Sequence, residues 1–244
     1  MNKYFAAIAA STILFQSVVA LAQPSGRTEQ VQFPKNSTST IIKGQVKGDL
    51  FIDYRVRASA GQTLAVTLKP SNPQNYFNIN PPSSDVSMFV GSSAGNSFKG
   101  MLPTDGDFTV RVYLMRPAAR RNESSNFSLS VEVSGKPLAP ISAQKDALIP
   151  GTPFHASAKI PCTNSIDPKI RECEAFVIRR SFDGTATVEV RNSILKRRIL
   201  FVKGKPVTSD SPEKLSVVRK GDNSIVSLGT FERFEIPDAL VVGG

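Results

Sequence analysis

Histidine and cysteine are scarce in this sequence. Its 244 residues include one histidine, His155, and two cysteines, Cys162 and Cys173. One histidine cannot build a multi-histidine metal site, and it allows at most one histidine-based catalytic dyad. No acid or nucleophile pattern surrounds His155, and the glycine-rich stretches lack the lysine and spacing of a phosphate-binding loop. We therefore predict no catalytic residues, no metal and no cofactor, with an unrecognised hydrolase as the alternative.

Acidic residues are also few. The chain has 20 Asp and Glu against 30 Lys and Arg, which gives a formal net charge of +10. Such an excess is typical of proteins that meet an anionic partner, such as nucleic acid, lipopolysaccharide or cell-wall polymer. Hydrophobic residues make up 40% and charged residues 20%, so the composition excludes collagen-like, disordered and coiled-coil classes and favours a globular protein.

Long apolar runs are absent after the N-terminus. Lys3, a charge-free apolar stretch and the triplet Ala20-Leu21-Ala22 are typical of a signal peptide at residues 1–22. We predict cleavage after Ala22 and export to a bacterial periplasm, so that the mature protein does not span the membrane; an uncleaved membrane anchor is the alternative. Export argues against nucleic acid as a partner, and an oxidising compartment favours a disulfide between Cys162 and Cys173.

The hydrophobic pattern predicts an all-β protein, because no convincing amphipathic helix appears and short β-branched or alternating runs recur. Residues 134–150 are rich in proline and glycine and form the expected linker. It separates an antiparallel β-sandwich at residues 28–133 from a small β-sheet or barrel domain at residues 151–244 that holds the disulfide. The expected strands are Thr38–Val46, Phe51–Arg57, Gln62–Leu68, Asn75–Ile79, Phe108–Met115, Phe127–Val133, Ala175–Arg180, Thr185–Val190, Ile194–Val202, Leu215–Val218, Ser224–Leu228 and Phe231–Ile236.

Basic residues gather at three places along the chain. Arg179-Arg180 and Lys196-Arg197-Arg198 fall within expected strands, so we place them on the solvent face of a sheet. Arg116, Arg120 and Arg121 instead follow an expected strand directly. Because guanidinium groups bind carboxylates and phosphates in a bidentate manner, a loop that presents them is suited to clasp an acidic group on a partner. The alternative is a solvated loop whose arginines pair with nearby acids.

A second candidate loop contains small and hydroxyl-bearing residues. Ser92, Ser93 and Asn96 lie between two expected strands, where a loop of small side chains is able to protrude into a narrow cleft. Tyr54 and Tyr113 are candidates to flank such a surface, although tyrosines on strands more often pack than recognise.

Two longer stretches resemble a known family. Ala60–Val66 followed by Tyr76–Ile79, and Leu102–Tyr113 leading into Arg116–Asn122, are similar to the periplasmic inhibitors of goose-type and invertebrate-type lysozymes. The resemblance covers residues 28–133. The first stretch, and the strand Asp107–Tyr113, also resemble small β-sandwich domains found at the ends of secreted bacterial peptidases. The C-terminal part, from Pro161-Cys162 to the end, is similar to a domain of uncharacterised exported bacterial proteins, which brings no known activity.

The inhibitor resemblance implies a β-sandwich that inserts protruding loops into the substrate cleft of a goose-type or invertebrate-type lysozyme and so protects peptidoglycan. Lysozyme catalysis needs an acidic side chain in the cleft, and a guanidinium bound to it would block both substrate entry and proton transfer. Arg116 and Arg120 match the arginine-bearing loop of the family. The residues expected to contact the partner are Arg116, Arg120, Arg121, Tyr113, Ser92, Ser93, Asn96, Asp53 and Tyr54.

The positive charge, which is distributed along the chain, supports a different function. Lysozymes are commonly cationic, so long-range electrostatics would oppose their association with a basic protein. The alternative function is therefore a non-catalytic envelope-binding module that holds an anionic cell-wall or lipopolysaccharide polymer.

Overall fold

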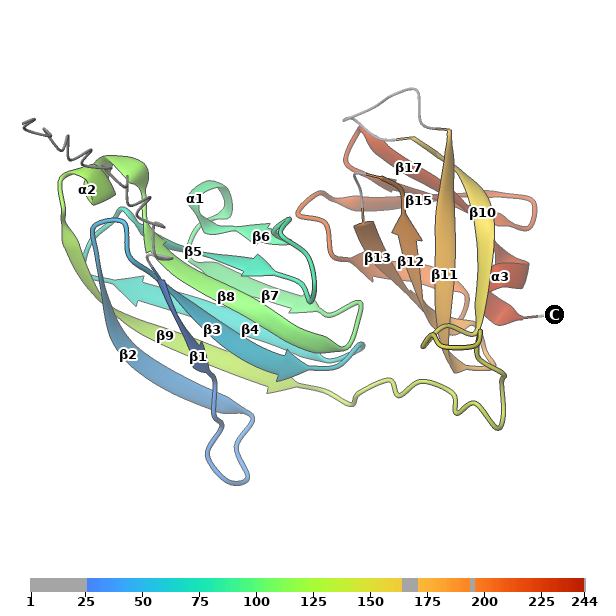
Figure 1. The fold of residues 1–244 in the computed structure, drawn as a ribbon, viewed down its shortest axis with the longest axis horizontal. Coiled ribbons are helices and arrows are strands. Elements are labelled where there is room, and N and C mark those ends of the chain that lie inside the picture. The colour runs from blue at the N-terminus through green and yellow to red at the C-terminus, as the bar shows by residue number, and fades with distance from the viewer. Residues whose placement is uncertain (1–25, 164–170, 194–195, 244) are drawn as a thin grey trace, which may run out of the picture.

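The computed structural model describes residues 26–163, 171–193 and 196–243, and the expected signal peptide lies outside these ranges. Figure 1 shows two β-rich units joined by an extended segment. Residues 26–134 form a five-stranded and a four-stranded sheet, and an eight-stranded sheet follows from residue 156. The expected all-β class is confirmed, and each unit has its own cluster of buried apolar side chains.

The first unit is a sandwich whose two sheets enclose one core. The five-stranded sheet has the order β1-β3-β8-β5-β6, and the four-stranded sheet has the order β2-β9-β4-β7. The strands are β1 (Gly26–Gln30), β2 (Ser39–Lys47), β3 (Phe51–Ala58), β4 (Thr63–Pro70), β5 (Asn75–Asn80), β6 (Phe89–Val90), β7 (Ser97–Met101), β8 (Gly106–Leu114) and β9 (Ser124–Ser134).

Side-chain alternation places this core. In β8 every second residue from Phe108 to Leu114 is buried, because successive side chains of a strand point to opposite faces. The buried residues of both sheets belong to one cluster, which includes Phe77 and Leu129. The pairing is antiparallel as expected except for β1, which runs parallel to β3. The polar sequence of Gly26–Gln30 carries no apolar periodicity, and this strand was not expected.

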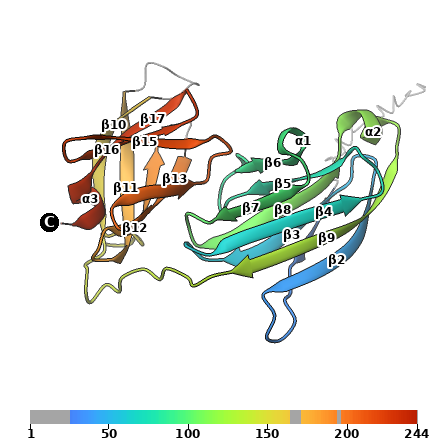
Figure 2. The same cartoon turned by 180° about the vertical axis from the view of Figure 1, so that it is seen from behind.

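The second unit is an eight-stranded sheet in the order β14-β13-β12-β11-β10-β17-β16-β15, which curls toward closure so that β14 comes near β15. Figure 2 shows it from the opposite side. Its elements are β10 (Ala156–Thr163), β11 (Glu172–Ser181), β12 (Thr185–Arg191), β13 (Lys196–Val202), β14 (Lys205–Ser209), β15 (Leu215–Lys220), β16 (Asn223–Leu228), β17 (Glu232–Pro237) and the short helix α3 (Asp238–Val242).

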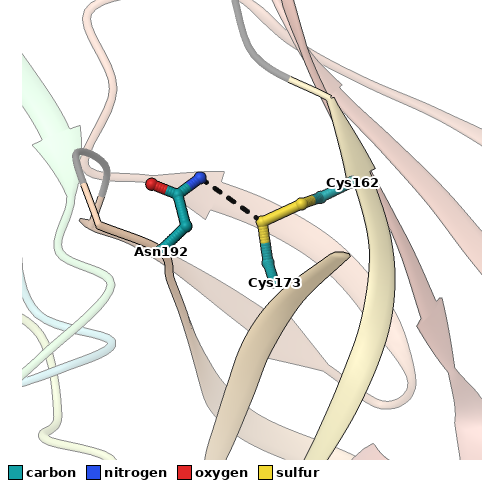
Figure 3. The surroundings of a disulfide bond; sticks show 3 residues. All are labelled: Cys162, Cys173 and Asn192. Carbon is teal, nitrogen blue, oxygen red and sulfur yellow. Dashed lines mark hydrogen bonds between the residues drawn. A yellow bond between two sulfur atoms is a disulfide. The ribbon is translucent and has the colours of Figure 1, made fainter. Parts of the chain in front are cut away.

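The expected disulfide joins β10 and β11. Cys162 and Cys173 are bonded, with their Cα atoms 5.8 Å apart. Asn192 donates a hydrogen bond from Nδ2 to Sγ of Cys173 at 3.6 Å, as Figure 3 shows. Most of the loop that the disulfide closes lies outside the described residues.

The connecting segment, residues 135–155, forms hydrogen bonds with both units. The backbone N–H of Leu138 donates to the carbonyl of Ala60 at 2.9 Å, and that of Ile141 donates to the carbonyl of Arg179 at 2.8 Å. His155 reinforces this contact because its Nδ1 accepts the Arg179 N–H at 3.0 Å, which leaves Nε2 to donate to the Ile141 carbonyl, also at 3.0 Å. The histidine therefore holds the segment against β11.

The expectation that the paired basic residues of the second unit face solvent is wrong. Arg179, Arg180, Arg197 and Arg198 are all buried, with exposed fractions of 8%, 8%, 7% and 5%. Each has a carboxylate partner within 3.3 Å, as buried charges require.

Contacts with segments outside the eight-stranded sheet explain the burial of Arg180. Its Nη2 donates to Oδ2 of Asp105 in the first unit at 2.8 Å, and Nη1 donates to the carbonyl of Leu138. Beside it, Thr187 donates from Oγ1 to the carbonyl of Pro103 at 2.7 Å. The first unit and the connecting segment thus cover the outer face of the sheet around Arg180. The alternation of the strand, taken alone, predicts that this face is exposed to solvent.

Candidate functional site

The arginine segment after β8 is a short helix, not the irregular loop that we expected. This helix, α2 (Arg116–Arg120), has Pro117 in its first turn, where the missing N–H of proline costs nothing and its fixed φ fits the helix. Ala118 and Ala119 of this helix are buried. The turn after the helix ends at Asn122, which has a φ of 53°. The arginines are therefore carried on an anchored element.

The three arginines differ in their partners. Arg121 donates from Nε to Oε1 of Glu123 at 2.6 Å, so the alternative of local pairing holds for this residue. A hydrogen bond from Asn72, together with Arg121, lowers the pKa of Glu123. Arg116 and Arg120 are exposed and make no ion pair with any described residue. Their four-residue spacing puts both guanidinium groups on one side of α2.

Asp53 lies on the outer face of the five-stranded sheet, where it binds an arginine that the sequence prediction missed. Arg111 donates two hydrogen bonds to its carboxylate, each at 2.7 Å, and the guanidinium carbon lies 4.0 Å from the ring centroid of Phe51. The hydrogen bond to Asp53 raises the pKa of Arg111 despite the opposing effect of burial. The charge of Asp53 is thus already balanced by Arg111, and its carboxylate is not free.

Asn78 connects Tyr113 with the second candidate loop. Its Oδ1 accepts the Tyr113 hydroxyl at 3.1 Å and the backbone N–H of Gly91 at 3.2 Å. Gly91 begins the short helix α1 (Gly91–Ala94), so this amide fixes the tyrosine ring and the helix relative to each other. Neither contact is evident from the sequence, because the first depends on the pairing of β5 with β8 and the second on the pairing of β5 with β6.

Ser92, Ser93 and Asn96 of the second loop differ in exposure and in hydrogen bonding. Ser92 and Ser93 lie in α1 and are exposed. Asn96 is half-buried and donates from Nδ2 to the carbonyl of Asn75 at 2.9 Å, so it anchors the loop instead of projecting from it. Figures 1 and 2 show α1 and α2 on the same side of the sandwich, with α1 nearer the second unit and α2 at the far end.

Tyr54 cannot contact a partner directly, and its inclusion in the expected surface is wrong. It is 1% exposed and packs in the core, with its ring centroid 6.4 Å from that of Phe127. The inward position follows from the alternation of β3, in which Asp53 faces outward. Burial raises the pKa of Tyr54 to about 12, with a further contribution from the charge of Glu29.

This burial predicts an alkaline transition. Tyrosine ionises near 10.0 in the unfolded chain but near 12 in the native protein, so stability present below pH 10 is lost as the pH rises toward 12. The loss attributable to Tyr54 is about 2 kcal/mol at pH 12. Urea unfolding at several alkaline pH values should show a smaller loss for Tyr54→Phe than for the native protein. Identical pH dependence in the two proteins would contradict this prediction.

The described residues contain no group of three or more His, Cys, Asp or Glu side chains arranged to hold a metal ion. Among the same residues, no helix has the length and apolar character needed to cross a membrane. What the described chain presents on this side is a β-sandwich with two unpaired arginines on α2, two exposed serines on α1 and a tyrosine tied to α1. Together these features form the candidate arginine-bearing surface.

Comparison with known proteins shows which proteins this chain resembles. No protein-family model matches the chain. The inhibitor of g-type lysozyme from Escherichia coli K12 is 22% identical over 126 residues, which are 50% of this chain and 93% of the inhibitor. The crystal structure of Aeromonas hydrophila PliG, a periplasmic lysozyme inhibitor of g-type lysozyme, is 30% identical and covers 45% of this chain and 97% of its own, with a TM-score of 0.40. The crystal structure of a mutant of Escherichia coli PliG is 25% identical and covers 45% of this chain and 99% of its own, with a TM-score of 0.37.

Over about half of its length, the chain is therefore similar to periplasmic inhibitors of g-type (goose-type) lysozyme, and the resemblance stated from the sequence is confirmed. The relatives are covered almost completely, so the other half of this chain is additional to them. The matched share corresponds in size to the first unit.

Proposed function

We propose that this protein is an exported, non-catalytic inhibitor of g-type lysozyme that acts in the periplasm. The observation that carries the proposal is the pair Arg116 and Arg120, exposed on one side of α2 without an ion-pair partner among the described residues. Other arginines of the first unit, such as Arg111 and Arg121, are already bound to carboxylates. A catalytic acid in a lysozyme cleft is a suitable ligand for the unpaired groups.

We further propose that α2 and α1 contact the cleft together. Both helices lie on one side of the sandwich, and the bonds of Asn78 to Tyr113 and Gly91 keep the surface between them in a fixed shape. A rigid surface loses little conformational entropy on binding, which favours tight association. In this arrangement Arg116 and Arg120 bind the acidic group, and Ser92 and Ser93 contact the cleft wall.

A cell-wall lysis assay tests the inhibition directly. The purified full chain is added at micromolar concentration to g-type, invertebrate-type and chicken-type lysozymes acting on suspended cell walls, and the fall in turbidity is followed. We expect the g-type enzyme to be slowed. An unchanged lysis rate for the g-type enzyme would refute the proposal, whatever the effect on the other two enzymes.

A further inference from the structure

The outer face of the four-stranded sheet carries four lysines: Lys43 and Lys47 on β2, Lys69 on β4 and Lys99 on β7. All four are exposed, and we call this surface the lysine face. Lys43 and Lys69 both lie opposite Ser128 of β9, so the three residues form one row across three strands. Two strand spacings separate the backbones that carry these two lysines, a distance of ~10 Å.

Positive charge is in excess on the lysine face. Glu132 is the acidic residue that this face contributes from β9, and neither it nor the four lysines make an ion pair with any described residue. The opposite outer face of the same sandwich differs, because Arg111 is bound to Asp53 and Arg57 to Asp107. On that face Arg55 also lacks an ion pair with a described residue, so the two faces differ in degree: two of its arginines are paired, whereas none of the four lysines is.

Hydroxyl and amide groups fill the space between the lysines. On β9 the outward residues next to Ser128 are Ser124, Asn126 and Ser130, and on β4 they include Thr67. Such groups both donate and accept hydrogen bonds, as the hydroxyl groups of a sugar require.

The apolar content of this face argues against a lipid as its ligand. Its exposed large apolar side chains are Ile41, on edge strand β2, and Met101, on the opposite edge strand β7. They lie at the two sides of the sheet and do not form the continuous apolar patch that acyl chains need. A ligand with anionic groups on a hydrophilic polymer fits the surface better than one with anionic groups on a lipid.

We propose that the lysine face binds an acidic cell-wall glycan, namely a peptidoglycan strand with its carboxylate-bearing peptides. The lysine ammonium groups attract the carboxylates, and the hydroxyl groups of β9 bind the sugars. Lysines on edge strands also deter sheet-to-sheet aggregation, but Lys69 lies on the interior strand β4, where that purpose does not apply.

One end of the lysine face lies close to α2. Beyond Lys47, the backbone N–H of Gly48 donates to the carbonyl of Glu123 at 2.9 Å, which places the end of β2 beside the turn that follows α2. A glycan on the lysine face therefore borders the arginine helix. The protein would be held on the polymer that a lysozyme attacks, with α2 left accessible.

Co-sedimentation with purified peptidoglycan sacculi tests the proposal, using the full chain at several salt concentrations. We expect retention that weakens as salt screens the lysines, and about tenfold weaker binding for Lys43→Gln/Lys69→Gln. The matched control is Arg55→Gln/Arg57→Gln, which removes the same charge from the opposite face of the sandwich and should leave retention unchanged. Sacculi with amidated carboxyl groups should bind poorly.

Three results would overturn the proposal: no retention at low salt, equal losses in the two double variants, or preferential binding to lipopolysaccharide micelles over sacculi. The lysis assay is run on the same variants. Because Lys43 and Lys69 lie away from α2, Lys43→Gln/Lys69→Gln should still inhibit free lysozyme acting on a soluble substrate. A failure of glycan binding is thereby distinguished from a failure of lysozyme inhibition.

Discussion

Replacing Arg116 and Arg120 together by alanine is expected to weaken inhibition of g-type lysozyme about a hundredfold or more. Both guanidinium groups lie on one side of α2 without a partner among the described residues, so they are free to bind an acidic group in the cleft. Arginine residues that become fully desolvated at an interface commonly dominate its binding energy. The measurement is the inhibitor concentration that halves the rate of cell-wall lysis.

Three controls separate recognition from charge and folding. Arg55→Ala/Arg57→Ala removes the same net charge elsewhere on the sandwich and should change potency little. Because the α2 arginines are exposed, their replacement should leave the thermal unfolding curve almost unchanged. Lysine at both positions should restore only part of the potency, because an ammonium group lacks the planar fork that binds a carboxylate at two points. Full potency of the double alanine variant would show that the inhibitory surface lies elsewhere.

The sequence identified the chemistry of this surface better than its geometry. The cluster from Arg116 to Arg121 stood out by composition, but which of its arginines is neutralised depends on Glu123, whose bond to Arg121 required the structure. The inward position of Tyr54, by contrast, follows from the sequence pattern. Ile52 and Val56 mark the inward positions of β3, and the same alternation places Tyr54 between them in the core.

Other contacts could not be predicted from local pattern. Arg111 meets Asp53, and Asn78 meets Tyr113, only because β8 lies between β3 and β5 in the sheet. Strand order and register are set by long-range packing, and a single sequence with alternating runs is compatible with several orders. The residues were therefore visible in the sequence, and their neighbours were not.

In the second unit, the burial of the arginines could not be predicted from alternation. Alternation distinguishes inward from outward positions when one face of a sheet is solvated, and this rule predicts solvent-facing positions for Arg180 and Arg198. In β12, however, consecutive residues from Thr185 to Val190 are all buried, because the core covers one face and the first unit approaches the other. Buried arginines in such a sheet need carboxylates from distant segments, and the sequence does not say which ones.

The ion pair between Arg197 and Glu232 gives the largest stability effect that we expect. Arg197 Nε and Nη2 each lie 2.7 Å from a Glu232 oxygen, and the exposed fractions of the two side chains are 8% and 11%. The pair links β13 to β17, which are not adjacent in the sheet. Glu232→Ala leaves a buried guanidinium without its partner, and we expect it to lower the free energy of unfolding by about 3–5 kcal/mol in urea titrations.

The same strand supplies the control for that loss. Glu235 of β17 is bound to Arg233, whose side chain is 49% exposed, and Glu235→Ala should cost less than about 1 kcal/mol because water screens the pair. The double variant Arg197→Met/Glu232→Leu then separates two physical causes. If the loss in Glu232→Ala comes from the unpaired charge, replacing both partners by apolar side chains should recover most of the stability. If the double variant is as unstable as Glu232→Ala, the pair itself stabilises the contact between β13 and β17, and the buried charge is not the cause.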